Sequence, residues 1–203
     1  MRVDFDPQTM SSRDFYTFMT ATVVPRPIAW VSTVNADSDG DNLAPHSFFN
    51  VACVSPPIVQ FTSVGRKDTL RNIEATGQFV VSLAPEALFE QINATSTDFP
   101  AGVSEFDEAG IEREASHRVK PPRVAGSPAA LECELHSTLL LGNSTVVFGR
   151  VVHAVVEEEA LSDDGLPDVT RLKPLTRLGR NQWAKTGDLL EIARVPYEEW
   201  RQR

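Results

Sequence analysis

Two long strand-forming runs separated by one dipeptide constrain the fold of this chain more than any other feature. Residues 129–141 and 144–157 are rich in valine and leucine, and Gly142-Asn143 between them suits a tight turn. A connection this short joins antiparallel neighbours, because parallel strands need a long crossover. The pattern therefore predicts an antiparallel hairpin in the last third of the sequence.

Shorter strand signals fill the first half of the chain. Residues 28–34 are β-branched and aromatic with partial alternation, a turn-forming cluster covers 35–41, and a return strand is expected over 42–53. Prolines then interrupt the chain before two further apolar runs, residues 58–63 and 79–83. With few helices and short turns, the sequence predicts a mainly β fold, a closed or nearly closed antiparallel barrel.

Two helices are predicted in the first half of the chain. Residues 11–20 carry an apolar stripe behind an N-cap at Ser11 or Ser12. The clearest helix signal begins with Asp68 as an acidic N-cap and ends at Gly77, which suits the left-handed conformation after a last turn.

The rest of the chain is less regular. Short helices are expected over residues 86–93 and 179–185. Residues 94–126 are rich in Ser, Asp, Glu, Gly and Pro, which predicts a long excursion from the barrel. Loops of this kind often cover binding sites.

Composition excludes several classes of protein. The 203 residues, 41% hydrophobic and 23% charged, are expected to form one domain over residues 1–203. No window approaches the roughly 20 apolar residues of a membrane helix, and no secretory pattern opens the sequence, so we expect a cytoplasmic protein. The net charge of −9 argues against nucleic-acid binding. Cys53, Cys133 and the histidines are scattered, which disfavours a disulfide framework and a metal site.

The first candidate site is the run Ala44-Pro45-His46-Ser47-Phe48-Phe49-Asn50 in the expected return strand. A half-buried strand does not need Pro, His, Ser and Asn so close together, because proline removes a ladder donor and buried polar groups need partners. Such a strand could border a planar heterocycle, with polar groups on its edge and a phenylalanine on its face. A bulge at the barrel edge with two core phenylalanines is the alternative interpretation.

The second candidate site is the run Thr62-Ser63-Val64-Gly65-Arg66-Lys67-Asp68-Thr69, where a strand leads into a helix. A helix N-terminus offers unpaired N–H groups and partial positive charge, to which Arg66, Lys67 and Thr69 add two cations and a hydroxyl. This predicts a phosphate site, although the Walker and dinucleotide-binding glycine motifs are absent. An exposed basic turn is the alternative.

The third candidate site is the run Arg177-Leu178-Gly179-Arg180-Asn181-Gln182-Trp183 in the tail. Its arginines and tryptophan could close over an anionic aromatic ligand by charge pairing and stacking. The alternative is a surface segment docked by Trp183.

Taken together and in this order, segments along most of the chain resemble the flavin reductase-like, FMN-binding split-barrel family, of the flavoredoxin-related kind. Their joint occurrence is more specific than any one of them. The matching stretches are RPIAWVSTV (26–34), NLAPHSFFN (42–50), PPIVQFTS (56–63), RKDTLRNI (66–73), GQFVVSL (77–83), ALECEL (130–135), GNSTVVFGRVV (142–152) and RLGRNQW (177–183).

The resemblance implies an antiparallel split β-barrel with a few short helices, which forms a homodimer and binds FMN at or near the subunit interface. By position, the family pattern assigns flavin contacts to Ser32, Thr33, Ser47, Phe48, Phe49, Asn50, Thr62 and Ser63. It assigns the contacts with the FMN phosphate to Arg66, Lys67 and Thr69. Further contacts are expected from Arg177 and Trp183.

The resemblance also implies an oxidoreductase, in which hydride passes from NADH or NADPH to flavin N5 and electrons pass on to free flavin or a protein acceptor. The protein would orient the flavin and place N–H donors near N1 and O2. His46 is a candidate proton donor or nicotinamide contact, or else a structural histidine. A flavoredoxin-like electron carrier without its own nicotinamide site, and a split-barrel protein that binds another ligand, are the alternatives.

Overall fold

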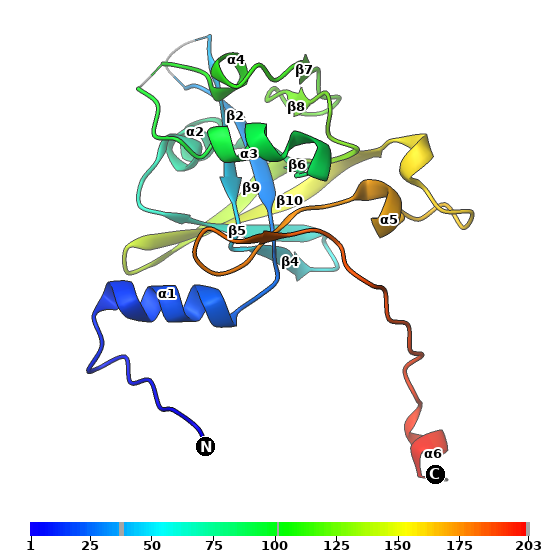
Figure 1. Cartoon of the computed structure of the whole chain (residues 1–203). Helices are drawn as coiled ribbons and strands as arrows, with labels where there is room; N and C mark the ends of the chain where they lie inside the picture. The colour runs from blue at the N-terminus through cyan, green and yellow to red at the C-terminus, as the bar shows by residue number, and fades with distance from the viewer. Residues whose placement is uncertain (37–38, 101, 202–203) are drawn as a thin grey trace.

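A seven-stranded antiparallel sheet forms the body of the protein (Figure 1). A computed structural model of the chain describes residues 1–36, 39–100 and 102–201. In spatial order the strands are β3 (Asp41–His46), β2 (Ala29–Val34), β6 (Gln78–Leu83), β9 (Ala129–Leu141), β10 (Ser144–Val156), β5 (Ile58–Val64) and β4 (Phe49–Cys53). The predicted mainly β class is confirmed.

The hairpin predicted from its two long runs is the centre of this sheet. β9 and β10 pair antiparallel from Ser144–Leu141 at the turn to Val156–Ala129 at the far end. Gly142 in the turn has φ 59°, a left-handed conformation that glycine adopts without a steric cost. A register shift follows Phe148, and at this point a Cβ on Gly149 would lie 2.2 Å from the ring of Phe79. Glycine therefore lets the phenylalanine pack onto the strand.

The return strand predicted over 42–53 is two strands, so that prediction is wrong in its continuity. β3 ends at His46, the chain bends at Ser47 and Phe48, and β4 then pairs with β5 at the opposite edge of the sheet. The Phe48 carbonyl still accepts a hydrogen bond of 2.9 Å from the Thr62 N–H. The sheet thus curls toward itself but has two unpaired edges, as a split barrel does. Part of the predicted turn 35–41 lies outside the described residues.

Apolar side chains fill the inside of the curled sheet. Phe61 and Phe79 meet edge to face with ring centroids 5.7 Å apart, and both are fully buried. Leu70 and Ile73 of the helix α2 join the same cluster. A second cluster around Trp30 lies under the loops, and the Trp30 indole donates to Thr95 Oγ1 at 2.9 Å.

Both helices predicted in the first half are present. α1 (Ser12–Thr22) has Ser11 as its N-cap, with the Ser11 hydroxyl accepting from the Asp14 N–H. α2 (Asp68–Thr76) ends at Gly77, which has a left-handed φ of 71°. Its N-cap is Lys67 rather than the predicted Asp68, because Asp68 already has helical geometry and is the first residue of the helix.

The remaining helices and strands are short. The helix expected over 86–93 appears as a 3-10 turn followed by an α-helix. The excursion 94–126 contains a helical turn and a small two-stranded sheet. These elements are η1 (Glu86–Leu88), α3 (Phe89–Ala94), α4 (Glu105–Glu108), β7 (Arg113–Glu114), β8 (Arg123–Val124), η2 (Glu158–Ala160), α5 (Val169–Leu172) and α6 (Tyr197–Trp200). No helix in the described part of the chain is long and apolar enough to cross a membrane.

The helix predicted over 179–185 is wrong. β12 (Trp183–Ala184) pairs with β11 (Thr176–Arg177), which pairs in turn with β1 (Arg26–Pro27) near the start of the chain. Arg180 in the intervening turn has φ 54°, which interrupts any helix. Pairing with a distant strand outweighs the local sequence pattern here.

Candidate functional site

A cavity of about 480 Å³ opens between β3 and β5. Its walls come from β3, β5, the bend after β3, the start of α2 and residues 95–99, with one residue each from α1 and α4. The lining residues are Tyr16, Asn42, Ala44, Pro45, His46, Ser47, Phe48, Thr62, Ser63, Val64, Arg66, Lys67, Asp68, Thr69, Arg71, Thr95, Ser96, Thr97, Asp98, Phe99 and Glu105. The volume lies within the range of about 300–1,000 Å³ that small-molecule sites occupy.

One end of the cavity is aromatic. The chain leaves the sheet at Ser47 and Phe48, so this stretch is outside the regular strand ladder. Tyr16 of α1 approaches Phe48 with ring centroids 6.4 Å apart, and the Arg26 guanidinium lies 5.9 Å from the Phe48 centroid. The arrangement suits the face and edge of a planar heterocycle.

The other end is the N-terminus of α2. No side chain caps this helix, which leaves the N–H groups of its first turn for a ligand. The Thr69 hydroxyl accepts a hydrogen bond of 3.0 Å from Asn42 Nδ2, and its own proton has no acceptor among the described residues. Arg66 and Lys67 flank this point. Together these groups can bind a phosphate.

Each cation near this helix end has an acidic partner within the chain. Lys67 Nζ lies 2.8 Å from Asp98, while Arg66 pairs with Glu74 and Arg71 pairs with Asp68. The Lys67 and Asp98 side chains are both largely exposed, so their pairing contributes little to stability. A phosphate that binds two of these cations can therefore replace the carboxylates at little cost.

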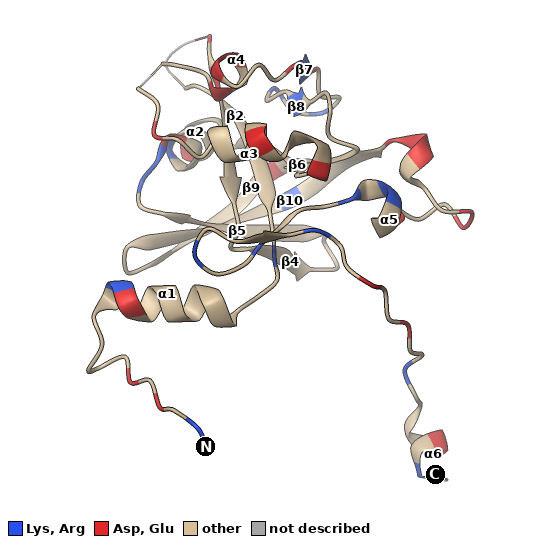
Figure 2. Cartoon of the chain, in the orientation of Figure 1, with Lys and Arg blue, Asp and Glu red and all other residues tan. Residues whose placement is uncertain are grey.

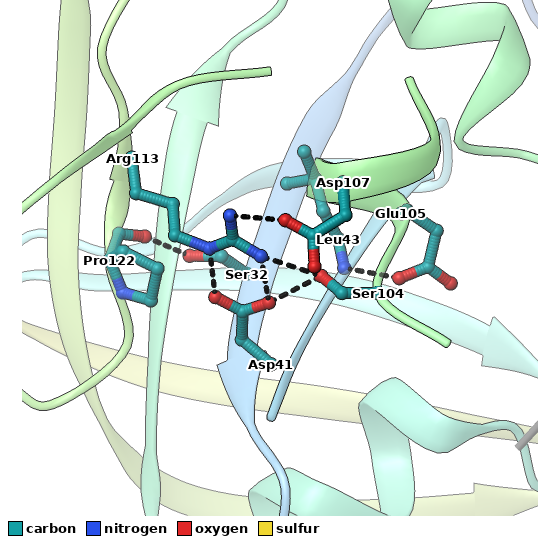
Figure 3. A network of polar contacts seen from close by, with 8 residues as sticks. All are labelled: Ser32, Asp41, Leu43, Ser104, Glu105, Asp107, Arg113 and Pro122. Atoms are coloured by element: carbon teal, nitrogen blue, oxygen red, sulfur yellow. Dashed lines mark hydrogen bonds and ion pairs between the residues drawn. The ribbon is translucent and has the colours of Figure 1, made fainter. Parts of the chain in front are cut away.

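A polar network holds the excursion against β3, next to the cavity (Figure 3). Arg113 Nε donates to Asp41 at 2.6 Å and Arg113 Nη1 donates to Asp107 at 2.7 Å. These carboxylates raise the pKa of Arg113. Glu105 accepts from the Leu43 N–H at 2.9 Å, and burial raises the pKa of its carboxyl. The network positions Glu105 in the wall of the cavity.

Four of the predicted flavin contacts do not line this cavity. Ser32 and Thr33 are fully buried, with the Ser32 hydroxyl donating to the Pro122 carbonyl and Thr33 Oγ1 accepting from Asn72. Phe49 packs against the core, and Asn50 accepts from the Val51 N–H at the surface. These four side chains therefore make contacts within the fold and do not face the cavity.

Arg177 and Trp183 also lie outside the cavity lining. They stack on each other, with the Arg177 guanidinium 4.6 Å from the Trp183 ring, and Trp183 meets Phe89 edge to face. Arg26 ties this region to α1, because it donates to the carbonyls of Thr20, Val23 and Leu178.

Sequence reasoning missed two walls of the cavity. From the sequence, Asn42 is placed in a strand and is not assigned to the site. Its amide, next to the predicted ligand-binding run, is a signal that could have identified it. Residues 95–99 and Glu105 come from the excursion, whose expected role as a cover did not specify which of its residues reach the site. Their proximity depends on long-range packing.

His46 is the histidine that lines the cavity. Its ring centroid lies 4.6 Å from that of Phe61, with the two rings tilted by 44°, and Nε2 is shielded from solvent without a hydrogen-bond partner among the described residues. Burial lowers the pKa of His46 to about 4, against a smaller opposing effect of the Thr62 backbone, and the charge of Lys67 lowers it further. The imidazole is therefore neutral at pH 7.

We expect acid to destabilise the protein through His46. The unfolded chain takes up a proton below pH 6.5, whereas folded His46 takes it up only near pH 4, so stability is lost as pH falls between these values. This group contributes a loss of about 2 kcal/mol between pH 7.5 and pH 5. Urea unfolding at both pH values should show that His46→Asn removes this part of the loss, while His136→Asn, at an exposed position, retains it. An equal pH dependence in all three proteins would contradict the assignment.

Comparisons with known proteins agree with the fold. Residues 20–176 match the family model described as "Flavin reductase like domain". Nitrilotriacetate monooxygenase component B from Bacillus cereus is 30% identical, with a TM-score of 0.90 over 95% of this chain and 99% of that one. The 2-nitrobenzoate 2-nitroreductase NbaA of Pseudomonas fluorescens is 29% identical, with a TM-score of 0.88 over 96% and 97% of the two chains.

A third structure supports the split barrel. It belongs to a Shewanella frigidimarina protein assigned as a flavin reductase with split barrel domain, and it matches 97% of this chain and 100% of that one with a TM-score of 0.84 at 21% identity. That likeness concerns the fold alone. The family model covers well over half of the sequence, and it includes the seven-stranded sheet and all of the cavity lining except Tyr16. This chain belongs to the family of proteins with a flavin reductase like domain.

Proposed function

We propose that the chain binds FMN in this cavity and acts as an FMN-dependent oxidoreductase that takes hydride from NADH or NADPH. The observation that carries the proposal is the pairing of an aromatic, polar cavity end at Phe48 with an uncapped helix N-terminus at Lys67. A flavin mononucleotide has the same two chemical ends, a planar ring system and a phosphate.

The residues present fit this cofactor. The Thr69 hydroxyl and the first-turn N–H groups of α2 offer donors to a phosphate, and Arg66 and Lys67 supply charge. Ser47 and Phe48 lie at the ring end, together with the polar side chains of Thr62 and Ser63. Six predicted contacts would have to be made by backbone atoms or from a second subunit, because these side chains do not line the cavity. The six residues are Ser32, Thr33, Phe49, Asn50, Arg177 and Trp183.

When bound, FMN supplies the redox chemistry by accepting hydride at N5 and passing electrons to free flavin or a protein acceptor. The chain's own part is to hold the ring and to donate hydrogen bonds where negative charge develops. His46, neutral at physiological pH, would contact the cofactor or the nicotinamide without adding a charge. Glu105 adds a carboxylate to the wall.

Family membership supports the oxidoreductase class, and the 29–30% identical structures described above include a nitroreductase and a monooxygenase component. We extend the proposal to a homodimer that works in the cytoplasm, where both nicotinamide donors are available. A flavoredoxin-like carrier that receives electrons from a protein, and has no nicotinamide site of its own, is the second candidate.

Steady-state oxidation of NADH and NADPH, with and without added FMN, separates the two candidates. We expect turnover with one nucleotide at least, and no turnover after FMN is removed. Oxidation of neither nucleotide by FMN-loaded protein would exclude the reductase while leaving the carrier. Protein that binds no FMN would exclude both candidates and favour a split barrel for another ligand.

A further inference from the structure

Two histidines from distant parts of the sequence meet outside the cavity. His117 belongs to the long excursion and is exposed, and His153 lies half-buried on β10. Their ring centroids are 5.0 Å apart, with the rings inclined to each other by 72°. Neither residue is among those that line the cavity, so the proposed FMN site does not account for this pair.

Both histidines are attached to the central hairpin of the sheet. His153 stands opposite Glu132 in the pairing of β10 with β9, directly after a register shift that follows Val151. The Glu132 carboxylate accepts a hydrogen bond of 2.9 Å from the His117 N–H, which ties the excursion to the same two strands. Glu132 is fully buried, so water does not compete for this hydrogen bond. The sheet therefore sets the positions of both backbones.

The two rings are open to a ligand. Among the described residues, neither imidazole forms a hydrogen bond or an ion pair, whereas the His136 ring on β9 has the Ser137 hydroxyl 3.0 Å from its Nδ1. The ring nitrogens of this pair are also not shut off from solvent, unlike Nε2 of His46. Imidazoles held for structure normally have a hydrogen-bond partner. This pair has unused donor and acceptor capacity at the surface.

The separation of the rings fits one shared metal ion. An imidazole nitrogen binds Zn²⁺ at about 2.0–2.1 Å, which places the ion about 3.2 Å from the ring centroid. Two imidazoles at a tetrahedral angle on the same ion then have centroids about 5.2 Å apart. The distance of 5.0 Å between His117 and His153 is close to this value. Rotation about χ2, which is a soft torsion in histidine, turns the nitrogens and leaves the centroids in place.

The donors select the class of metal. Imidazole nitrogens suit Zn²⁺ and other first-row transition metals, whereas Mg²⁺ and Ca²⁺ require oxygen ligands. Glu132 is not a third ligand, because its oxygens accept from two backbone N–H groups and pair with Arg123. The small sheet of β7 and β8 beside it carries basic residues (Figure 2). In the described part of the chain, no three His, Cys, Asp or Glu side chains converge on one point, so water would fill the other positions.

We propose that His117 and His153 together bind one transition-metal dication of the Zn²⁺ type. The two ligands come from segments 36 positions apart in the sequence, which is too far for a local metal-binding motif, and only the fold brings them together. The ion joins the excursion to β10. Since the excursion also supplies residues 95–99 and Glu105 to the cavity wall, the ion fixes the segment that closes the cavity.

Calorimetric titration of the untagged protein with Zn²⁺, in buffer without chelators, tests the proposal. We expect one Zn²⁺ per chain, and His117→Asn or His153→Asn to weaken binding at least about tenfold, because changes outside the ligand shell already cost about 10–100-fold. His136→Asn, at an exposed position on β9, is the matched control and should bind Zn²⁺ within about twofold of wild type. Absence of saturable Zn²⁺ binding, saturable binding of Mg²⁺ in its place, or equal affinity in all variants would overturn the proposal.

Chemical modification locates the ion in the unchanged protein. Diethyl pyrocarbonate reacts with free imidazole nitrogens, and peptide mass spectrometry gives the rate at each histidine. We expect Zn²⁺ to slow the reaction of His117 and His153 and to leave that of His136 unchanged. Zinc that protects neither histidine of the pair, or all three equally, would contradict the site. Neither experiment depends on flavin, so both are independent of the proposed function.

Discussion

Replacing Arg66 and Lys67 together by alanine is expected to weaken FMN binding about 100-fold and riboflavin binding less than about threefold. The two ligands share the ring and the ribityl chain, and only FMN carries the phosphate. Charge-assisted hydrogen bonds contribute about 1.5–3 kcal/mol each, and about 3 kcal/mol remains after their carboxylate partners Asp98 and Glu74 are displaced. Quenching of flavin fluorescence in parallel titrations measures both affinities.

A charge-matched variant separates local binding from the general effect of charge. Arg118→Ala with Lys120→Ala removes two cations from exposed positions that do not line the cavity. We expect this variant to bind FMN within about twofold of wild type, because screening weakens distant charges. Equal losses of FMN and riboflavin affinity in the Arg66 and Lys67 variant would show that the phosphate lies elsewhere.

The second large effect is expected for Glu132→Gln, which should lower the free energy of unfolding by about 3 kcal/mol. Glu132 is fully buried on β9 and accepts from the N–H groups of His117 and Arg118 at 2.9 and 2.6 Å. Burial alone would raise its pKa, but these donors and the nearby His153 and Arg123 hold the pKa below the usual value. The amide removes one of the two carboxylates that pair with the buried Arg123 guanidinium, and the partly exposed Glu114 is the one that remains.

Glu134→Gln on the same strand is the control for this substitution. Glu134 pairs with Arg150 at the surface, where both side chains are about half exposed, so we expect a change within about 0.5 kcal/mol. Urea unfolding of both variants measures the difference. A Glu132→Gln variant as stable as Glu134→Gln would show that the buried pair does not hold the excursion to the barrel.

Local patterns predicted the elements whose partners are close in sequence. The bounds of β9 match the expected run, and those of β10 differ by one residue, because a two-residue turn and β-branched side chains specify a hairpin without help from the rest of the chain. α2 was predicted for the same reason, since its helix stop lies within the helix signal itself.

Distant contacts decided the elements that were predicted wrongly. Residues 42–53 keep strand character throughout, and only the pairing of β3 with β2 and of β4 with β5 divides them at Ser47 and Phe48. The tail has local helix character around Gly179, but pairing with β1 draws it into a small sheet. Such choices depend on tertiary structure and leave no periodic signal in one segment.

The part of the candidate site that could be predicted is the part built from residues close together in the sequence. Ser47, Phe48 and the run from Thr62 to Thr69 lie close in sequence to the bend and the helix end that define the cavity. Ser32 and Thr33 were selected by the resemblance, but their side chains bind the Pro122 carbonyl and Asn72 inside the fold. Residues 95–99 reach the cavity through the long excursion, which sequence alone did not place.

The measurement that tests the central claim most directly is the absorbance of the purified protein after incubation with FMN and removal of free ligand. The account predicts the yellow colour and absorbance bands of bound flavin, with about one FMN per chain, and loss of most of that FMN from the Arg66→Ala and Lys67→Ala double variant. Protein that stays colourless after incubation, or a double variant that retains FMN as well as wild type does, would contradict it.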